Sequence, residues 1–496
     1  MKTLEADVTI LGSGFGGTLL ALVLQKLGRT PLLLERHAHP RFAIGESSTP
    51  LANLFLENLC RTYDLEQLLP FCKYGSWKRT HPEVTCGLKR GFSFFKHAPG
   101  ERFEATDTHS NELLVAANPS AELGDTQWFR EEVDFYFVQE AQRSGIPYLD
   151  QTEVTEVDRT SAGRWQLRAR RPDTEIRVTT PFLVDATGAS AFLYRLPAFD
   201  ARTRPLRTRS WTLFSHFKDV RPWAEVLDEL GARQSDYPFD CDDAALHHVF
   251  DHGWMWLIRF DNDVTSAGLV FNRDRRPFDP DEPKERIWQE ALAAFPSLQA
   301  QFRDAEPVRD YTVLAPLQRR QATLAGDGWA ALPFSACFID PLFSTGIAHT
   351  LLGVERLARL FEHGDRLPAP TALHAYSEAF QGEIDFLDRL VHGAYRAFPC
   401  FELFVAYAMY YFTGAIYSEM RRKRNLWTPD DAFLFSHDPR FRQAAETAYH
   451  VLLELDGAPT PAEVAAFTER VARDIAPLNV AGLADPSRHN LYPFVE

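Results

Sequence analysis

A glycine-rich turn close to the N-terminus constrains the fold of this chain more than any other feature. Residues 12–17 read Gly-Ser-Gly-Phe-Gly-Gly and match the pattern G-x-G-x-x-G. An apolar run, 8–11, precedes the turn, and an apolar stretch with helical character, 18–27, follows it. A second apolar run, 31–34, ends at Glu35. This order predicts strand, tight turn, helix and strand, the opening βαβ unit of a doubly wound parallel sheet.

Each part of this unit has a physical role in binding a dinucleotide. The first glycine permits the turn, the second lets the backbone approach a pyrophosphate, and the third lets helix and strand pack closely. The unpaired N–H groups and the dipole of the helix N-terminus favour phosphate. A carboxylate about 20 residues later can accept ribose hydroxyls. The alternative is a glycine-rich turn in an unrelated α/β protein. The predicted dinucleotide contacts are Gly12, Gly14, Phe15, Gly16, Gly17, Glu35 and Arg36.

The rest of the chain predicts an α/β protein with a β-rich insert and a helical end. Residues 130–143 have apolar positions at helical spacing. Segments within 205–315 alternate between polar and apolar residues, which is typical of antiparallel strands. From residue 372 onward the pattern is helical. We therefore expect a nucleotide-binding domain in two parts, 1–204 and 316–370, an antiparallel β substrate domain, 205–315, and a helical C-terminal domain, 371–496.

Composition excludes several classes of function. The 496 residues carry a formal net charge of -15 and no long Lys/Arg tract, so sequence-independent binding to nucleic acid is not expected. The six cysteines form no C-x-x-C pair, which argues against a zinc knuckle or disulfide framework and fits a reducing cytoplasm. We expect no signal peptide, and the apolar run 403–417 is too short to span a membrane.

One short segment contains several residue types that can bind a metal ion. The run Asp240-Cys241-Asp242-Asp243 is followed by His247-His248. Its spacing matches no strong ligand motif, so a loop and the start of a strand are favoured, and no metal is predicted.

Three later segments identify the dinucleotide. They are residues 41–48, which contain Gly-Glu-Ser-Ser, residues 185–190, Asp-Ala-Thr-Gly-Ala-Ser, and residues 339–347, Ile-Asp-Pro-Leu-Phe-Ser-Thr-Gly-Ile. Together they resemble the FAD-binding segments of flavoprotein monooxygenases with the p-hydroxybenzoate hydroxylase fold. The resemblance implies a Rossmann-like FAD-binding domain. It implies FAD contacts at Arg41, Ser47, Ser48, Arg130, Asp185, Thr187, Gly188, Asp340, Pro341, Ser344, Thr345, Gly346 and Ile347. No second dinucleotide motif is found for a nicotinamide cofactor, so we expect a separate flavin reductase.

Within this superfamily the chain looks most like the flavin-dependent halogenases. Residues 253–258 match the W-x-W-x-I part of a family signature, and residues 88–94, Leu-Lys-Arg-Gly-Phe-Ser-Phe, resemble the segment with the reactive lysine. The resemblance implies halogenation of an electron-rich aromatic compound, of phenol, pyrrole or indole type and free or carrier-bound, with reduced FAD, oxygen and halide. On this match Lys89 binds or activates hypohalous acid, Trp254 and Trp256 keep the substrate from the flavin, and Thr345 and Gly346 hold the halide.

Two departures from the family pattern keep other functions open. Arg259 stands where the signature has proline, and Pro333-Phe334-Ser335 replaces a Gly-Asp-Ala element, which removes a carboxylate near the flavin ribityl chain. The alternatives are a flavin monooxygenase that hydroxylates an aromatic or a protein tryptophan, a reductase of the geranylgeranyl-reductase type, and a flavin-carrying interaction protein without activity.

The candidate catalytic residues also have plainer interpretations. Lys89 could be a solvated charge at a strand edge, and Trp254 and Trp256 could be core aromatics. One of the two adjacent histidines should face the same pocket as Trp254, which makes His248 or His247 a candidate for proton handling. The basic run 421–424 is interpreted as a solvated face, with a membrane or carrier-protein contact as the alternative.

Overall fold

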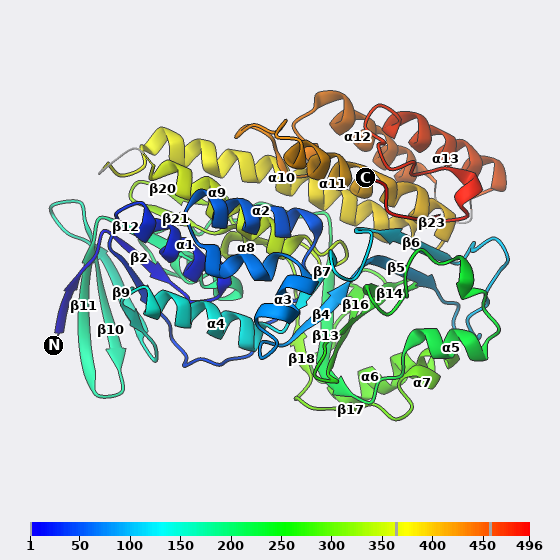
Figure 1. Ribbon diagram of the computed structural model, residues 1–496, viewed down its shortest axis with the longest axis horizontal. Helices are drawn as coiled ribbons and strands as arrows, with labels where there is room; N and C mark the ends of the chain where they lie inside the picture. The colour runs from blue at the N-terminus through cyan, green and yellow to red at the C-terminus, as the bar shows by residue number, and fades with distance from the viewer. Residues whose placement is uncertain (1, 363–365, 456–458) are drawn as a thin grey trace.

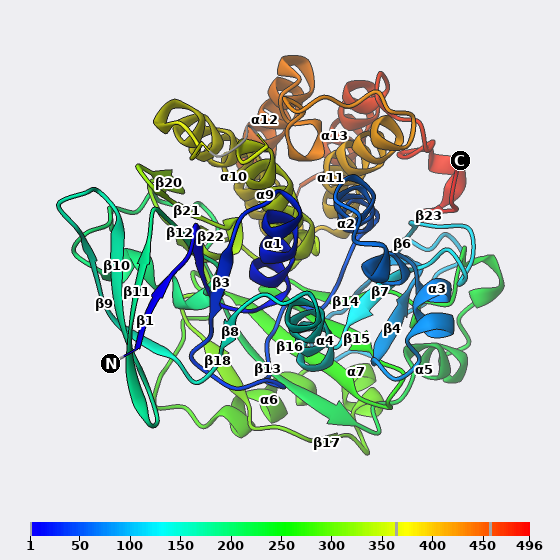
Figure 2. The same cartoon turned by 60° about the vertical axis from the view of Figure 1, so that its left-hand side comes forward.

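A computed structural model describes residues 2–362, 366–455 and 459–496 of the chain. Figures 1 and 2 show a nucleotide-binding half with the N-terminus, a second half built on a large sheet, and helices α10 to α13 along one side of both. This arrangement agrees with the α/β class and the helical C-terminal region expected from the sequence.

The N-terminal half contains the predicted parallel sheet. Its strand order is β20-β21-β12-β2-β3-β8, with β2, β3, β8, β12 and β21 parallel and β20 antiparallel. Buried Val, Leu and Ile side chains on β2 and β3 suit a sheet covered on both faces. The strands are β2 (Val8–Leu11), β3 (Pro31–Leu34), β8 (Tyr148–Leu149), β12 (Phe182–Asp185), β20 (Ala325–Gly326) and β21 (Trp329–Ala331).

Helices and a smaller sheet complete this half. The helices are α1 (Phe15–Lys26), α2 (Pro50–Thr62), α3 (Tyr74–Thr80), α4 (Arg130–Arg143), α8 (Pro333–Ala336) and α9 (Thr345–Leu360), with 3₁₀ turns η1 (Glu66–Cys72), η2 (Gly188–Ser190) and η3 (Leu193–Arg195). A four-stranded sheet has the order β1-β11-β10-β9, from β1 (Lys2–Glu5), β9 (Glu153–Arg159), β10 (Trp165–Arg171) and β11 (Thr174–Thr180). Two strand pairs are β4 (Cys86–Lys89) with β7 (Asp125–Trp128) and β19 (Arg319–Arg320) with β22 (Cys337–Phe338).

The second half is built on a nine-stranded sheet of order β17-β13-β16-β15-β14-β5-β6-β23, with β18 also paired to β13. Its central hairpins come from the predicted insert: β13 (Ser210–Lys218), β14 (Ala245–Phe250), β15 (Gly253–Arg259), β16 (Thr265–Asn272), β17 (Glu306–Pro307) and β18 (Thr312–Leu314). Helices α5 (Trp223–Glu229), α6 (Lys284–Ala293) and α7 (Pro296–Gln301), with the turn η4 (Gln234–Asp236), belong to the same segment.

This sheet extends beyond the predicted boundaries 205–315. Strands β5 (Gly91–Lys96) and β6 (Glu112–Ala116) lie in the segment assigned to the FAD-binding domain, and β23 (Leu491–Tyr492) comes from the C-terminal segment. Strand β5 pairs in parallel with β14, and β23 pairs in parallel with β6. Pairings between such distant segments leave no signal in the local sequence pattern, which is why the boundaries missed them.

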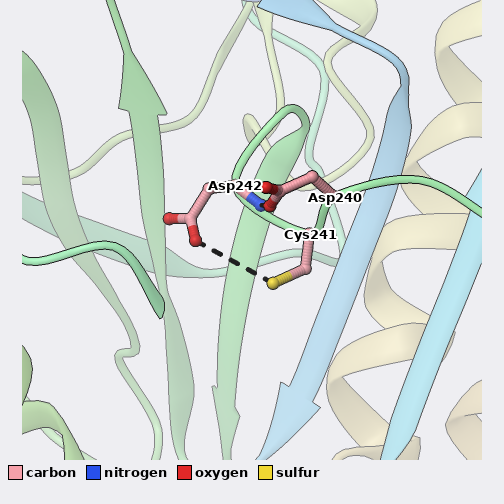
Figure 3. Close-up of side chains that lie close together, drawn as sticks. All are labelled: Asp240, Cys241 and Asp242. Atoms are coloured by element: carbon pink, nitrogen blue, oxygen red, sulfur yellow. Dashed lines mark hydrogen bonds between the residues drawn. The ribbon is translucent and has the colours of Figure 1, made fainter. Parts of the chain in front are cut away.

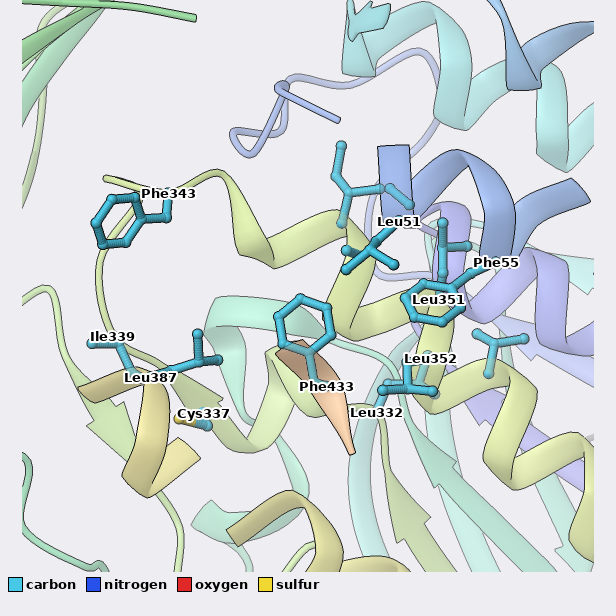
Figure 4. Packing of buried hydrophobic residues seen from close by; sticks show 14 of the residues in the cluster. Leu51, Phe55, Leu332, Cys337, Ile339, Phe343, Leu351, Leu352, Leu387 and Phe433 are labelled. Carbon is cyan, nitrogen blue, oxygen red and sulfur yellow. The ribbon is translucent and has the colours of Figure 1, made fainter. Parts of the chain in front are cut away.

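The C-terminal helices pack on the nucleotide-binding half through apolar side chains. Figure 4 shows Leu51 and Phe55 of α2 beside Leu351 and Leu352 of α9, with Phe433 of the C-terminal segment close by. No helix among the described residues is both long and apolar enough to cross a membrane. The elements are α10 (Pro370–Ala397), α11 (Phe401–Lys423), η5 (Phe433–Phe435), α12 (Pro439–Glu454), α13 (Pro461–Ile475) and η6 (Pro486–Arg488).

Candidate active site

A long cleft between the two halves brings the predicted cofactor motifs together. Its cavity of about 470 Å³ is lined both by the glycine turn at Gly12 and Gly14 and by the loop from Pro341 to Ile347. Residues from the nine-stranded sheet, including Trp256, close the same cavity. Segments that are far apart in the chain therefore form one continuous site.

The glycine turn has the geometry of a phosphate cradle. Gly12 has a φ of +97°, and a Cβ there would lie 2.4 Å from the carbonyl oxygen of Ala186. A Cβ on Gly17 would lie 2.3 Å from the oxygen of Gly12, so both positions require glycine. At Gly14, by contrast, an added Cβ would meet no atom closer than 3.5 Å, and no side chain caps the start of α1. This opening fits a diphosphate group.

Glu35 lies at the end of β3, where a ribose would bind. Its Oε2 accepts hydrogen bonds from the backbone N–H of Ser13 at 3.1 Å and from Arg41 at 3.0 Å. Burial raises the pKa of Glu35, but the charge of Arg41 and the N–H donors of His37 and Ser13 outweigh it and hold the pKa below its usual value. The carboxylate is therefore ionised at neutral pH and suited to accept hydroxyl groups.

Arg130 holds the loop that follows β3. Its guanidinium forms two hydrogen bonds with Asp134, at 2.9 and 2.8 Å, and donates to the carbonyl oxygens of Ile44 and Gly45. Asp134 also accepts the backbone N–H of Phe15, at 3.2 Å. The Arg130–Asp134 pair thus ties the start of α1 to this loop, and Arg130 still lines the cleft.

The other end of the cleft is formed by the start of α9. Ser344 has a φ of +51° and precedes a helix N-terminus without a side-chain cap. A Cβ added to Gly346 would meet no atom within 4 Å. The N–H groups of this turn are therefore open to an anion in the cleft, as expected for the halide position at Thr345 and Gly346.

Three of the predicted cofactor residues do not line the cleft, because their polar groups hold neighbouring segments. Asp340 accepts hydrogen bonds from Ser210 at 2.8 Å and Tyr395 at 2.9 Å, and burial raises its pKa to about 6. Asp185 accepts from Thr187 and Leu193, and the Ser48 hydroxyl lies against Asn53 and Thr126. The structure thus corrects their assignment from direct contact to support of the cofactor loops. The other predicted cofactor residues, Gly12, Gly14, Phe15, Gly16, Gly17, Glu35, Arg36, Arg41, Ser47, Arg130, Thr187, Gly188, Pro341, Ser344, Thr345, Gly346 and Ile347, all line the cleft.

The two signature tryptophans lie on the cleft wall and are held by hydrogen bonds. The indole N–H of Trp254 donates to the hydroxyl of Tyr395 at 3.0 Å, and that of Trp256 donates to Ser266 at 3.2 Å. Tyr395 in turn donates to Asp340, so Trp254 is linked to the loop at the start of α9. Both tryptophans belong to the main core and also line the cleft, so the two interpretations of them are compatible.

The two adjacent histidines of β14 face opposite sides of the sheet. His247 lines the cleft and stacks on Phe94, with ring centroids 4.2 Å apart. His248 lies on the other face, within hydrogen-bond distance of His97 and Gln301. Successive side chains in a strand point to opposite faces, so of the two candidate histidines His247 faces the site and the prediction for His248 is wrong. Burial lowers the pKa of His247 to about 3.

Lys89 is wholly buried at the end of β4. Its ammonium donates to the Ser47 hydroxyl at 2.8 Å and to the Ser48 carbonyl at 2.7 Å, and Nζ lies 4.0 Å from the centroid of the Phe92 ring. Burial lowers the pKa of Lys89 to about 7, against the opposing charge of Asp125. The interpretation of Lys89 as a solvated surface charge is therefore wrong.

A second cavity is lined by a residue that Lys89 contacts, Phe92. It has a volume of about 450 Å³ and is lined by Phe92, Tyr411 and Phe412 and by the C-terminal residues 492–496. Lys89 contacts Ser47, which lines the first cavity, and Phe92, which lines the second. The ammonium therefore contacts one residue from the wall of each cavity, while Lys89 itself lines neither.

Two groups singled out in the sequence have structural roles. Asp240, Cys241 and Asp242 lie close together (Figure 3), but Asp242 accepts hydrogen bonds from the N–H groups of Trp223 and Ala224 and pairs with Arg259. Besides Asp242, Arg259 binds the carbonyl oxygens of Val220 and Arg221, and it does not line the cleft. The replacement of the signature proline therefore places no charge in the cleft.

The basic run at the end of α11 is largely engaged within the protein. Arg421 pairs with Asp431, Arg422 pairs with the buried Glu355, and Lys423 pairs with Glu419. Arg421 and Arg422 are thus only partly exposed, whereas Lys423 and Arg424 are exposed, so the predicted solvated face is confirmed for the second half of the run only.

Sequence reasoning missed several residues of the site. Phe334 and Arg319 line the first cavity, Phe92 lines the second, and Asp125 lies directly opposite Lys89 on β7. Phe92 follows the lysine motif closely and could have been found from the i, i+3 spacing. Arg319 and Asp125 lie on strands of two and four residues outside any motif, so only the tertiary structure reveals them.

Comparisons with known proteins agree with this site. A family model described as tryptophan halogenase matches residues 130–399. The chain is 32% identical to monodechloroaminopyrrolnitrin halogenase of Pseudomonas fluorescens over 84% of this chain and 72% of that protein. It is 26% identical to tetracycline 7-halogenase of Kitasatospora aureofaciens over 98% of this chain and 90% of that protein. The crystal structure of the halogenase PltM in complex with phloroglucinol and FAD matches with a TM-score of 0.87 at 22% identity, over 98% of this chain and 99% of that one.

Proposed function

Since the chain belongs to the tryptophan halogenase family and is a flavin-dependent halogenase that uses FAD, we propose that its substrate is an electron-rich aromatic compound bound in the second cavity. The observation that carries the proposal is the position of the buried Lys89, which contacts Ser47 from the wall of the cavity that fits FAD and Phe92 from the wall of a second cavity with aromatic residues. Direct contact between substrate and flavin is not needed in this arrangement, because a small oxidised halogen species can pass the lysine.

The residues of the first cavity hold the reagents. Bound FAD, once reduced, supplies with oxygen the oxidising power that turns halide into hypohalous acid. The open N–H groups at Thr345 and Gly346 hold the halide, and Trp254 and Trp256 fill the wall opposite. Apolar bulk at that wall excludes water and leaves no room for an aromatic substrate beside the flavin.

Lys89 activates the hypohalous acid. As a cation it donates a hydrogen bond to the oxygen of the acid, which makes the halogen more electrophilic and supplies a proton to the departing hydroxide. The proton lost by the aromatic ring then restores the ammonium, so that aromatic compound and hypohalous acid yield halogenated product and water. A lysine with a pKa of about 7 is suited to both steps near neutral pH.

The second cavity favours a free small molecule with an aromatic ring. Phe92, Tyr411 and Phe412 offer ring faces, and Glu419, 8% exposed, is the buried carboxylate among the described residues that line it. An N–H or O–H group on the substrate would donate to Glu419. Relatives named for carrier-bound pyrroles are 23 to 24% identical, whereas monodechloroaminopyrrolnitrin halogenase is 32% identical. We also propose that a separate reductase delivers reduced FAD.

The proposal is tested by turnover of phenols, anilines and pyrroles with FAD, a flavin reductase, NADH, oxygen and bromide, read by mass spectrometry. Wild type is expected to form brominated product. Lys89→Ala should form it at least about 100-fold more slowly, which is the usual effect of removing a positioned general acid. Lys218→Ala, at the exposed end of β13, is the control. Oxygenated product that forms equally without bromide, or bromination that survives in Lys89→Ala, would contradict the proposal.

A further inference from the structure

Arg319 presents a fixed cation to the FAD cleft. Its guanidinium carbon lies 4.7 Å from the ring centroid of Phe334 and 5.6 Å from that of Phe338, and all three residues line the cleft. The guanidinium also donates to the carbonyl oxygen of Phe334. Two aromatic contacts and a backbone hydrogen bond therefore hold a side chain that is otherwise flexible.

Arg319 differs from Arg41 and Arg130 of the same cleft in having no carboxylate partner in the part of the chain that the structure describes. Arg41 pairs with Glu35 and Arg130 pairs with Asp134, whereas Arg319 has no acidic group within 4.0 Å among the described residues. Its Nε is buried without a hydrogen-bond partner. Burial lowers the pKa of Arg319 to about 10, opposed only by Cys337 and Asp185. Arg319 is half-buried, and a charge partly removed from water without an acidic partner is unfavourable, so the site is prepared for an anion from a ligand.

The position of Arg319 favours the flavin ring over the diphosphate as the source of that anion. The diphosphate has its own place at Gly14, where Arg41 and Arg130 lie within 4 Å of an added Cβ. Strand β19, which carries Arg319, pairs with β22, and β22 leads within two residues into the Asp340 loop at the ring end of the cleft. A reduced flavin ring carries a negative charge at neutral pH, whereas an oxidised ring is neutral.

We propose that Arg319 makes the cleft bind reduced FAD more tightly than oxidised FAD. An enzyme supplied with reduced cofactor by a separate reductase would then capture the reduced form and release the oxidised form after turnover. Phe334 stands where the family pattern has the carboxylate near the ribityl chain, so that position carries no negative charge to oppose binding of the reduced ring. This inference rests on the FAD-binding part of the proposed function and not on the identity of the aromatic substrate.

The test compares Arg319→Gln, which keeps a donor for the Phe334 carbonyl but removes the charge, with Arg319→Lys, which keeps the charge. Dissociation constants are measured for oxidised FAD, for reduced FAD under anaerobic conditions and for ADP, together with the midpoint potential of the bound flavin. A charged hydrogen bond contributes enough that we expect Arg319→Gln to bind reduced FAD about tenfold more weakly. Oxidised FAD and ADP should change less than about twofold, and for a two-electron couple the potential should fall by about 30 mV.

Several results would overturn the inference. Equal weakening of both redox forms with an unchanged potential would assign Arg319 a structural role, and weaker ADP binding would assign it to the diphosphate. Arg319→Lys keeps the charge and should keep the preference for reduced over oxidised FAD. If it loses that preference as fully as Arg319→Gln, while its melting curve matches wild type, the charge is not responsible. Arg202→Gln, at an exposed arginine outside the cleft, is the control. These measurements need neither halide nor aromatic substrate, so their failure is distinct from failure of halogenation.

Discussion

The buried pair of Lys89 and Asp125 should make this protein less stable than a version without it. The two residues are directly opposite each other on β4 and β7, and neither has any exposed surface. Burial lowers the pKa of Lys89 from 10.5 to about 7 and raises the pKa of Asp125 from 3.8 to about 6. One oxygen of Asp125 accepts a hydrogen bond from Asn53 at 2.6 Å and lies 4.0 Å from the ammonium of Lys73, and the other is buried without a hydrogen-bond partner among the described residues.

The pKa shifts of Lys89 and Asp125 change stability with pH in opposite directions, one above neutral pH and one below it. Between pH 7 and 10.5 the unfolded chain keeps the lysine proton that the folded chain has released, so stability rises with pH in that window. Between pH 3.8 and 6 the folded chain keeps the Asp125 proton that the unfolded chain has lost, so stability falls as pH rises. The pair should therefore be most unfavourable between pH 6 and 7.

The perturbation is the double variant Lys89→Met/Asp125→Asn, which replaces both charges by neutral side chains of similar size. At about 1.4 kcal/mol per pKa unit, the shift at Lys89 alone corresponds to about 5 kcal/mol. Loss of the lysine hydrogen bonds to Ser47 and Ser48 offsets about 1 to 3 kcal/mol of that. We therefore expect the double variant to be more stable than wild type by about 2 to 4 kcal/mol at pH 6.5.

Denaturant unfolding of wild type, both single variants and the double variant at pH 5, 6.5 and 9 checks this. Asp125→Asn leaves the buried Lys89 without its neighbouring carboxylate, and Lys89→Met leaves Asp125 with Lys73 alone, so each single variant should be less stable than the double variant at pH 6.5. The advantage of the double variant should shrink at pH 9, where Lys89 is neutral in wild type. A double variant that is less stable than wild type at pH 6.5, or an advantage that does not change with pH, would refute the reasoning.

Two further predictions concern the glycine turn, which matches the dinucleotide motif, and Arg259, which departs from the tryptophan signature. In Gly12→Ala the added Cβ would lie 2.4 Å from the carbonyl oxygen of Ala186, at a φ of +97°, and such strain costs about 1 to 3 kcal/mol. A fluorescence titration should therefore show FAD bound about tenfold more weakly or worse. An unchanged affinity would show that the turn does not hold the diphosphate. Arg259→Pro restores the signature residue but loses the hydrogen bonds to Asp242, Val220 and Arg221. We therefore expect a lower melting temperature and an unchanged ratio of brominated to oxygenated product. A changed product ratio would show that Arg259 takes part in the reaction.

The sequence predicts those elements whose signal is local. Strands 8–11 and 31–34 and the helix 130–143 have the bounds expected from hydrophobic periodicity, because each buries one face or a whole short run. The makeup of the large sheet was not predictable in the same way. Strand β5 joins β14 across about 150 residues of sequence, and β23 joins β6 from the far end of the chain. Such pairings depend on tertiary contacts that no window of sequence contains.

The same distinction separates the predicted site residues from the missed ones. Backbone cradles such as the Gly12 turn need particular residue types at fixed spacing, so a motif reveals them. Motifs do not separate a residue that contacts the cofactor from one that supports the contact, which is why Asp340 and Asp185 were assigned to direct binding. Side chains that act through electrostatics, such as Asp125 beside Lys89, have no spacing rule at all.

The two departures from the family pattern are accommodated in different ways, and this difference bears on function. Arg259 turns away from the cleft and replaces the rigidity of a proline with bonds to Asp242 and two carbonyl oxygens, so the tryptophan strand keeps its place. The loss of the carboxylate at 333–335 is not restored in kind: Ser335 accepts the N–H of Gly188, and Arg319 brings the opposite charge to the same region. A structural substitution conserves the geometry of the site, whereas a reversal of charge changes which state of the cofactor the site prefers. The first departure therefore leaves the wall of the cleft in place, and we expect the second to be measurable as a difference in affinity between reduced and oxidised FAD.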